Sequence, residues 1–158
     1  MADAYTVALT LLSARELSEA QLRTRLKRRQ IDDDDIEAAV SRLKGDGTLN
    51  DRRVAVALAR MESAIKHRGR SRVIQKIRQA GIDNDTAEDA VREVFEEVDE
   101  SALLDRALER RLRGKTATEL DDKGRARVIR GLVAQGFRLE AVLNRLRAHA
   151  LRRDGSED

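Results

Sequence analysis

Basic side chains at helical spacing are the residues of this chain with the clearest chemistry. Arg72 and Lys76 lie one turn apart and Gln79 follows one turn later, so all three share one face of a helix. Val73 and Ile77 form the adjacent apolar face, which places the two cations at its edge toward solvent. A guanidinium or ammonium row of this kind is typical of surfaces that contact phosphate or carboxylate groups.

Comparable cations occur in two other stretches, and together they form the candidate contact set for a partner or for DNA. The residues are Arg25, Lys27, Arg29, Arg68, Arg70, Arg72, Lys76, Arg78, Arg127 and Arg130. The simpler alternative is that these cations only solvate helix faces and balance the acidic helices. Aromatic residues make up 2% of the chain, which argues against recognition of bases by stacking.

Charge alternates strongly along the chain although the net charge is only +3. Residues 66–82 hold six bases and no acid, residues 83–100 hold nine acids and one base, and residues 123–138 hold five bases and no acid. Charge segregated by helix predicts a basic surface and a separate acidic one.

The composition argues against several classes of protein. Without cysteine there is no disulfide framework, thiolate metal site or cysteine nucleophile, and no apolar run is long enough to cross a bilayer. The first residues lack the basic start of a secretory signal, so we expect a cytoplasmic protein without membrane contact. The acidic run Asp32–Asp35 fits the first turn of a helix better than a metal site, and His67 and His149 have no evident partners. We therefore expect no metal, no cofactor and no enzyme activity.

The elements that carry these side chains are predicted to be helices throughout. A helix over residues 4–14 is followed by Ser18 and Gln21, which are spaced as a capping box, and Asn50 is placed to cap a helix running to about residue 67. Val54, Leu58, Met61 and Ile65 are predicted to share one apolar face of that helix. Gly81 is expected to adopt the left-handed conformation that ends a helix, and residues 114–124 are expected to form a loop.

The order of a basic helix, a short break, one apolar residue and a second helix recurs three times. The apolar anchors Ile31, Ile82 and Phe137 follow one another at intervals of about fifty residues, a period typical of repeat arrays. The predicted fold is all-α, an elongated curved array of three three-helix repeats. Its expected parts are residues 1–48, 49–98 and 99–152, followed by a disordered tail at 153–158.

Three segments carry motifs in a fixed order. They are Leu17-Ser18-Glu19-Ala20-Gln21-Leu22 after an opening helix, Leu49-Asn50-Asp51-Arg52-Arg53-Val54-Ala55, and Gly69-Arg70-Ser71-Arg72-Val73-Ile74-Gln75-Lys76-Ile77-Arg78-Gln79-Ala80-Gly81-Ile82. Together they resemble the RecX family, the bacterial regulatory proteins that modulate the RecA recombinase, over roughly residues 4–150. Arg70 replaces the proline usual in that family and Val54 the usual phenylalanine, and neither change is expected to alter the fold.

The resemblance implies a non-enzymatic regulator, expected to be a monomer, that acts in DNA repair, homologous recombination and the SOS response. Such proteins bind in the groove of RecA–DNA filaments and touch more than one RecA subunit. They typically inhibit strand exchange, ATP hydrolysis and co-protease activity, and they meet single- or double-stranded DNA through the filament. Two other functions stay open. The chain could be a stand-alone helical-repeat protein that binds DNA through its phosphates, or a general adaptor for other proteins.

Overall fold

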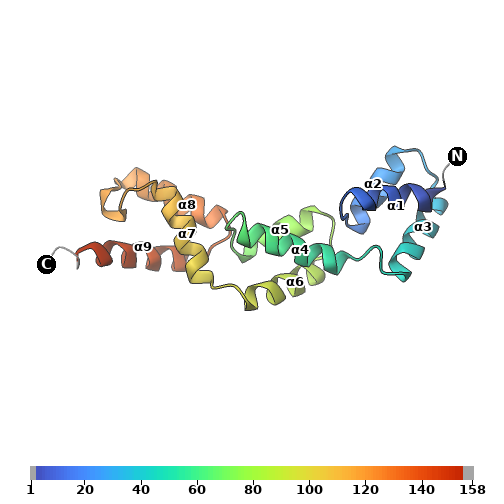
Figure 1. Ribbon diagram of the computed structural model, residues 1–158. Coiled ribbons are helices and arrows are strands. Elements are labelled where there is room, and N and C mark those ends of the chain that lie inside the picture. The colour runs from blue at the N-terminus through green and yellow to red at the C-terminus, as the bar shows by residue number, and fades with distance from the viewer. Residues whose placement is uncertain (1–2, 155–158) are drawn as a thin grey trace. The chain divides into compact units, whose positions relative to one another are not determined.

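The computed structural model describes residues 3–154, and within them the secondary structure consists of nine α-helices, one 3-10 helix and no strand (Figure 1). The elements are α1 Ala4–Ala14, α2 Glu19–Arg28, α3 Asp33–Gly45, α4 Asp51–Ala64, α5 Arg70–Gln79, α6 Asn84–Glu96, α7 Glu100–Leu112, η1 Ala117–Glu119, α8 Asp122–Ala134 and α9 Leu139–Asp154. The predicted all-α class is confirmed.

Polar side chains begin the helices where the sequence predicts that they should. Ser18 accepts a hydrogen bond from the backbone N–H of Gln21, whose side chain accepts from the Ser18 N–H, so the capping box of α2 is confirmed. Asn50 Oδ1 accepts from the backbone N–H of Arg53 at 3.1 Å at the start of α4. Asp32 precedes α3 without a side-chain capping bond, and the three following carboxylates lie in its first turn. These carboxylates therefore stabilise α3 through their charge near the positive end of the helix dipole, not by capping hydrogen bonds.

Three local predictions differ from the structure. Helix α4 ends at Ala64 instead of near residue 67, because the chain turns back with His67 at φ 51° and the Arg68 N–H donates to the Glu62 carbonyl. Residues 114–124 are not a plain loop, since η1 lies within them and α8 has begun at Asp122. Helix α9 runs to Asp154 and so includes two residues of the predicted tail. Residues 155–158 lie outside the described part of the chain.

The helices form two compact units. The first comprises the chain up to Ala59 together with Ile74–Arg92, and the second comprises Arg60–Val73 together with the chain from Glu93 onward. Helices α4, α5 and α6 therefore contribute residues to both units. The repeat limits expected from the sequence stay a prediction.

In the first unit, α1, α2 and α3 pack against one another around an aliphatic core. Its fully buried side chains are Leu17, Leu22, Leu26, Ile36, Val40 and Leu43. The start of α2 is fixed to the end of α5, because the Ser18 hydroxyl donates to the Ala80 carbonyl. Next to it the Glu19 N–H donates to Asp51 Oδ1 at 2.8 Å.

Gly81 is required where α5 ends. Its φ of +81° is the left-handed conformation predicted from the sequence, and a Cβ there would lie 2.4 Å from the Cβ of Ala20. Both the backbone conformation and the close approach of α2 therefore exclude a side chain.

In the second unit, α7, α8 and α9 pack together and the segment leading into α5 crosses the turn between α8 and α9. The Gly69 N–H donates to the Gln135 carbonyl at 2.9 Å, and Ser71 Oγ donates to the Gly136 carbonyl at 3.1 Å. A Cβ on Gly69 would lie 2.4 Å from the Gly136 carbonyl oxygen. Two glycines thus allow two backbones to touch, and this crossing places α5 against the end of α8.

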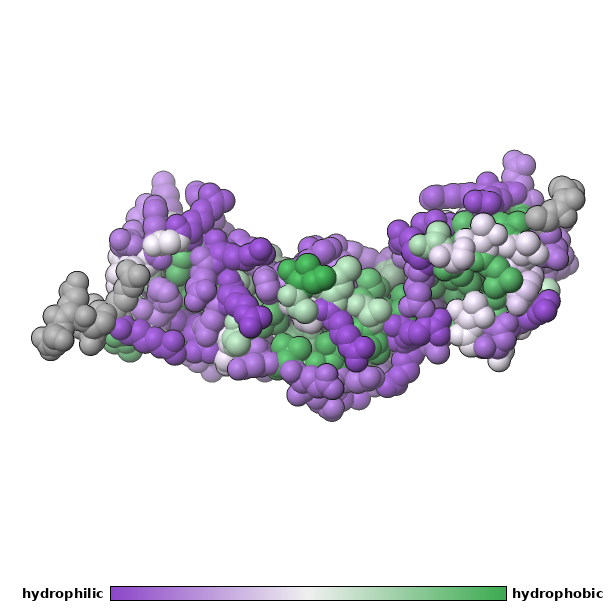
Figure 2. All heavy atoms as spheres, in the orientation of Figure 1, coloured by the Kyte–Doolittle hydropathy of each residue, from purple (hydrophilic) through white to green (hydrophobic). Residues whose placement is uncertain are grey.

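The predicted apolar face of α4 is buried only in its first half. Val54 is buried, but Met61 is 37% exposed, and Ile65, just past the end of the helix, is 68% exposed. In the same turn Glu62 and Ser63 are buried, so the last turn of α4 buries polar residues and leaves its apolar ones at the surface. Apolar patches bordered by hydrophilic residues are visible on the face drawn in Figure 2.

Candidate anion-binding clefts

A cleft of about 450 Å³ in the second unit gathers five basic side chains from the α4–α5 connection, α5 and α7. We call it the cationic cleft, and its lining is Lys66, Arg68, Arg72, Arg110 and Arg111, completed by Ile65, Gly131, Ala134 and Gln135. Five cations that line one hollow raise the local positive potential and attract anions. The arrangement is therefore suited to bind phosphate or carboxylate groups.

A buried carboxylate holds two of these cations in place. Glu62 is only 2% exposed, and its carboxylate lies 3.2 Å from Lys66 Nζ and 2.5 Å from Arg68 Nη1. A buried carboxylate needs such partners, because its loss of hydration is costly. One acid against five bases leaves the cleft with an excess of positive charge.

Arg111 is fixed by the backbone of α8. Its Nη2 donates to the Gly131 carbonyl at 3.0 Å and to Gln135 Oε1 at 3.2 Å. A Cβ on Gly131 would lie 2.1 Å from Arg111 Nη1, so the guanidinium occupies the space that the glycine leaves. Gln135 Nε2 donates in turn to the His67 carbonyl at 2.8 Å, which ties the α4–α5 connection to α8.

His67 lies at a neighbouring hollow of about 380 Å³ with Arg106, Glu109 and Arg110. Burial of the imidazole, together with the charges of Arg110 and Arg106, lowers the pKa of His67 from its ordinary value. Its Nδ1 is buried and has no hydrogen-bond partner within the described residues. The imidazole is therefore neutral at pH 7 and adds no fixed charge to the cleft.

A second hollow with three arginines lies in the first unit. This arginine cleft has a volume of about 290 Å³ and is lined by Arg15, Arg25 and Arg28 of the first helices and by Gln79, Ala80 and Gly81 at the end of α5. Gln21 and Thr24 complete its wall. Three arginines and no acidic residue are among its described lining residues, which again favours an anionic ligand.

The candidate residues of the first repeat are not brought together. Arg25 lines the arginine cleft, whereas Lys27 Nζ lies 3.2 Å from Asp33 Oδ1 in an exposed ion pair. Arg29 lies at a different hollow of about 630 Å³ between α1 and the α2–α3 connection. Their shared position in the sequence therefore does not give them a shared surface.

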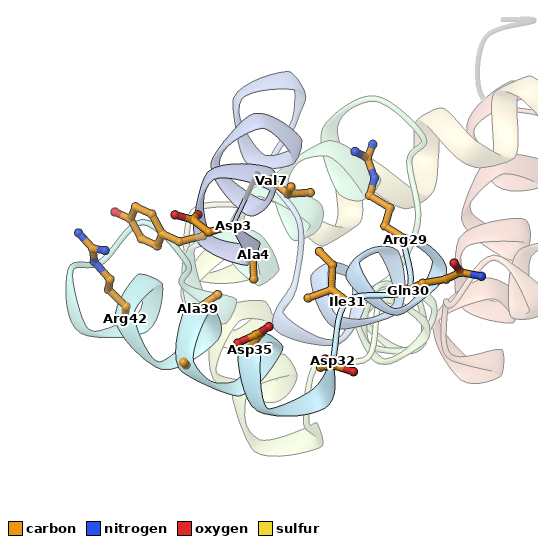
Figure 3. A pocket seen from close by; sticks show the side chains of 12 residues that line it. Asp3, Ala4, Val7, Arg29, Gln30, Ile31, Asp32, Asp35, Ala39 and Arg42 are labelled. Carbon is orange, nitrogen blue, oxygen red and sulfur yellow. The ribbon is translucent and has the colours of Figure 1, made fainter. Parts of the chain in front are cut away.

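The hollow at Arg29 is mixed in character. Figure 3 shows that the apolar side chains of Val7, Ile31 and Ala39 surround this hollow. Gln30 and Arg42 point away from it on opposite sides. Arg42 lies 3.9 Å from the centre of the Tyr5 ring. The lining of this hollow includes both carboxylates and arginines, which are Asp3, Asp32, Asp35, Arg29 and Arg42. This balance of charge makes it a poor anion site.

The remaining candidate residues fall into two groups. Arg68 and Arg72 line the cationic cleft, but Arg70 forms an ion pair with Glu100, and its guanidinium carbon lies 5.2 Å from the centre of the Phe95 ring. The others lie on helix surfaces, with Lys76 half-buried and Arg78, Arg127 and Arg130 exposed.

On α8 the two candidate arginines adjoin the cationic cleft. Arg127 precedes Gly131 by one turn and Arg130 precedes Ala134 by one turn, so each shares a helix face with a residue of the lining. They are placed to extend the cleft along α8.

Sequence reasoning missed four arginines that line the clefts. They are Arg15 and Arg28 in the first unit and Arg110 and Arg111 in the second. The last two lie in α7 among alternating acids and bases, where nothing in the local pattern distinguishes them. The useful signal was Gly131, a glycine inside a helix, since a helical glycine often marks the close approach of another group.

Known proteins resemble this chain along most of its length. Models of the first and second three-helix domains of RecX match residues 4–43 and 50–91. The chain is 35% identical over 135 residues to "Regulatory protein RecX" of Syntrophotalea carbinolica, an alignment that covers 85% of this chain and 88% of the relative. It is 30% identical over 156 residues to the protein of the same name from Pelodictyon phaeoclathratiforme, covering 98% and 92%.

The chain belongs to the RecX family. Solved structures agree in fold, because the crystal structure of RecX from Lactobacillus salivarius matches with a TM-score of 0.80 at 18% identity, covering 94% of this chain and 95% of that one. A second crystal structure, of "regulatory protein RecX", gives a TM-score of 0.76 at 22% identity over 87% of this chain and 67% of that one. The resemblance stated from the three sequence motifs is confirmed.

Two residues of the RecX-like motif around Asp51 have clear structural tasks. Asp51 holds the start of α2 through the Glu19 N–H, and burial raises its pKa. Arg53 donates to the carbonyls of Gly47 and Thr48, each at 2.9 Å, and pairs with Glu16. In this chain the motif therefore fixes the α3–α4 connection rather than forming a cleft.

Within residues 3–154, no helix combines the length and apolarity needed to span a bilayer. In the same range no cluster of three or more histidine and acidic side chains is arranged to hold a metal ion.

Proposed function

We propose that this chain regulates RecA by binding in the groove of RecA–DNA filaments. The observation that carries the proposal is its membership of the RecX family through two matched three-helix domains. The cationic cleft and the arginine cleft supply the chemistry, because a RecA–DNA filament offers phosphates and carboxylates to arginine donors. One cleft lies in each compact unit, so a single chain has two separate anion-binding surfaces.

Two surfaces on one chain favour bridging of neighbouring RecA subunits. The second contact then forms intramolecularly, which raises avidity without any new chemistry. A bridge across subunits obstructs the space that a second DNA or a protein substrate would enter, and it holds the interfaces at which ATP is hydrolysed. The expected effect is inhibition of strand exchange, ATP hydrolysis and co-protease activity.

The decisive test is ATP hydrolysis by RecA on single-stranded DNA while this protein is titrated in. We expect hydrolysis to fall at protein concentrations well below that of RecA. The double charge reversal Arg72→Glu with Lys76→Glu should abolish this inhibition while helicity stays unchanged. Arg147→Glu with Arg152→Glu, two exposed positions on α9 that line none of the clefts described, is the matched control. If the variant with Arg72→Glu and Lys76→Glu still inhibits RecA fully, the basic helix is not the contact surface and its assignment is refuted.

The second candidate function is direct DNA binding without RecA, and the arginine-rich clefts are the observation that favours it. It predicts binding to bare single-stranded DNA with a log–log salt slope of about −0.7 for each phosphate neutralised. Hydrolysis would then fall only where the protein coats the DNA. Measuring DNA binding alone at matched salt separates the two functions.

A further inference from the structure

The mouth of the cationic cleft carries an exposed apolar side chain. Ile65 lines the cleft and is 68% exposed, and Met61, one turn earlier on α4, is 37% exposed. Removing a large aliphatic side chain from water on binding stabilises a complex. An apolar group beside five cations therefore fits a ligand that is itself both acidic and apolar.

Three of the five cations of the cleft are held in place by contacts within the chain. Glu62 orients Lys66 and Arg68, and the Gly131 carbonyl and Gln135 orient Arg111. Fixed guanidinium groups lose less freedom on binding, and among the described residues Arg111 Nη1 and Arg68 Nη2 have no hydrogen-bond partner and are placed to donate to a carboxylate. Such a site does not depend on the high charge density of a phosphate backbone.

Features that favour a nucleic acid are weak at this cleft. No aromatic side chain is among its lining residues, so bases have no stacking surface there. Phe95 and Phe137, the two phenylalanines of the chain, are 3% and 9% exposed and belong to the core. A phosphodiester backbone also gains little from contact with Ile65.

We propose that the cationic cleft binds an acidic protein segment whose carboxylates pair with Arg68, Arg72, Arg110 and Arg111 and whose apolar side chain packs on Ile65. This inference rests on the proposed function, because the segment is assigned to the RecA subunits of the filament and not to the DNA. Charge complementarity and the apolar group at the mouth of the cleft together select this ligand. Contact with DNA is left to other surfaces of the chain.

Site-specific photo-cross-linking tests the identity of the ligand. The full chain carrying benzoylphenylalanine in place of Ile65 is mixed with RecA filaments on oligo-dT, irradiated and digested for mass spectrometry. We expect an adduct with a RecA peptide that contains Asp or Glu next to an apolar residue. An adduct with DNA, or no adduct from chain that co-sediments with the filaments, would overturn the proposal.

Two serine variants test the energetic role of the apolar group. Ile65→Ser should lower filament affinity about tenfold and leave binding to bare DNA unchanged. Leu151→Ser, at a leucine 71% exposed on α9 away from the cleft, is the control and should bind like the unaltered chain. Equal affinities for both variants would refute the inference alone. Failure of the unaltered chain to co-sediment with RecA filaments would instead refute the proposed function, and the inference with it.

Discussion

The crossing of Gly69 and Gly136 predicts a large loss of stability for a very small change, Gly136→Ala. Gly136 has a φ of +107°, and a Cβ there would lie 2.6 Å from the Gly69 carbonyl oxygen and 2.7 Å from both the Cβ and the backbone nitrogen of Arg72. The neighbouring atoms include backbone that is itself hydrogen-bonded across the crossing. The new methyl group therefore cannot be accommodated by rotation of a side chain.

Two costs add at this position. Holding a non-glycine residue in this conformation costs about 1–3 kcal/mol, and forcing a methyl group into closed packing costs about 1–3 kcal/mol more. We expect Gly136→Ala to lower the free energy of unfolding of the second unit by about 2–6 kcal/mol. The control Gly114→Ala shares a positive φ, +83°, but has nothing within 4 Å of the new Cβ. It should therefore lose only about 1–2 kcal/mol.

The assay is urea unfolding followed by far-ultraviolet circular dichroism. With central losses of about 4 and about 1.5 kcal/mol and a slope of about 2 kcal/mol per molar, the two variants should differ in midpoint by roughly 1 M. Gly45→Ala completes the series, because that glycine lies in α3 with no close neighbour, and it should raise stability by about 0.5–1 kcal/mol. Equal midpoints for Gly136→Ala and Gly114→Ala would show that the backbones do not touch as described.

Three further predictions concern single side chains. Ser18→Ala removes the cap of α2 and leaves the Ala80 carbonyl without its hydroxyl donor, so thermal unfolding should show an unfolding free energy lower by about 2–3 kcal/mol. A decrease no greater than about 1 kcal/mol would mean that only the cap contributes to stability. Glu62→Gln should lower the free energy of unfolding in urea by about 2–4 kcal/mol, because Lys66 and Arg68 lose their buried partner. The control Asp89→Asn, in an exposed ion pair, should lower it by under about 1 kcal/mol. Similar decreases for the two variants would contradict the burial of Glu62. Because the pKa of His67 is lowered in the folded state, folding favours the neutral imidazole, and this stabilisation is present above pH 6.5 and is lost as pH falls through the lowered pKa. The unfolding free energy of the unaltered chain, compared with that of His67→Asn, should therefore decrease from about pH 7.5 to about pH 5.5. A difference between the two chains that stays constant with pH would refute this.

The sequence by itself determined the local structure and the family. Helix starts follow from capping chemistry that acts within one turn, which is why the Ser18 capping box and the left-handed Gly81 were predictable. The buried faces of α5 and α7 likewise follow from apolar residues at helical spacing. The motifs around Asp51 and Gly69 indicated the RecX family because the types and order of their residues are read directly from the sequence.

Only the tertiary structure decided which cations share a surface. Arg72 joins Arg110 and Arg111 because the Gly69–Gly136 crossing and the Arg111–Gly131 hydrogen bond bring α5, α7 and α8 together across long sequence distances. Arg25 and Arg29, one turn apart in the sequence, line different hollows. Periodicity aligned Ile65 with Val54 on one apolar face, but burial depends on what packs against each position. Val54 is buried, whereas Ile65, just past the end of α4, is 68% exposed and is left at the mouth of the cleft.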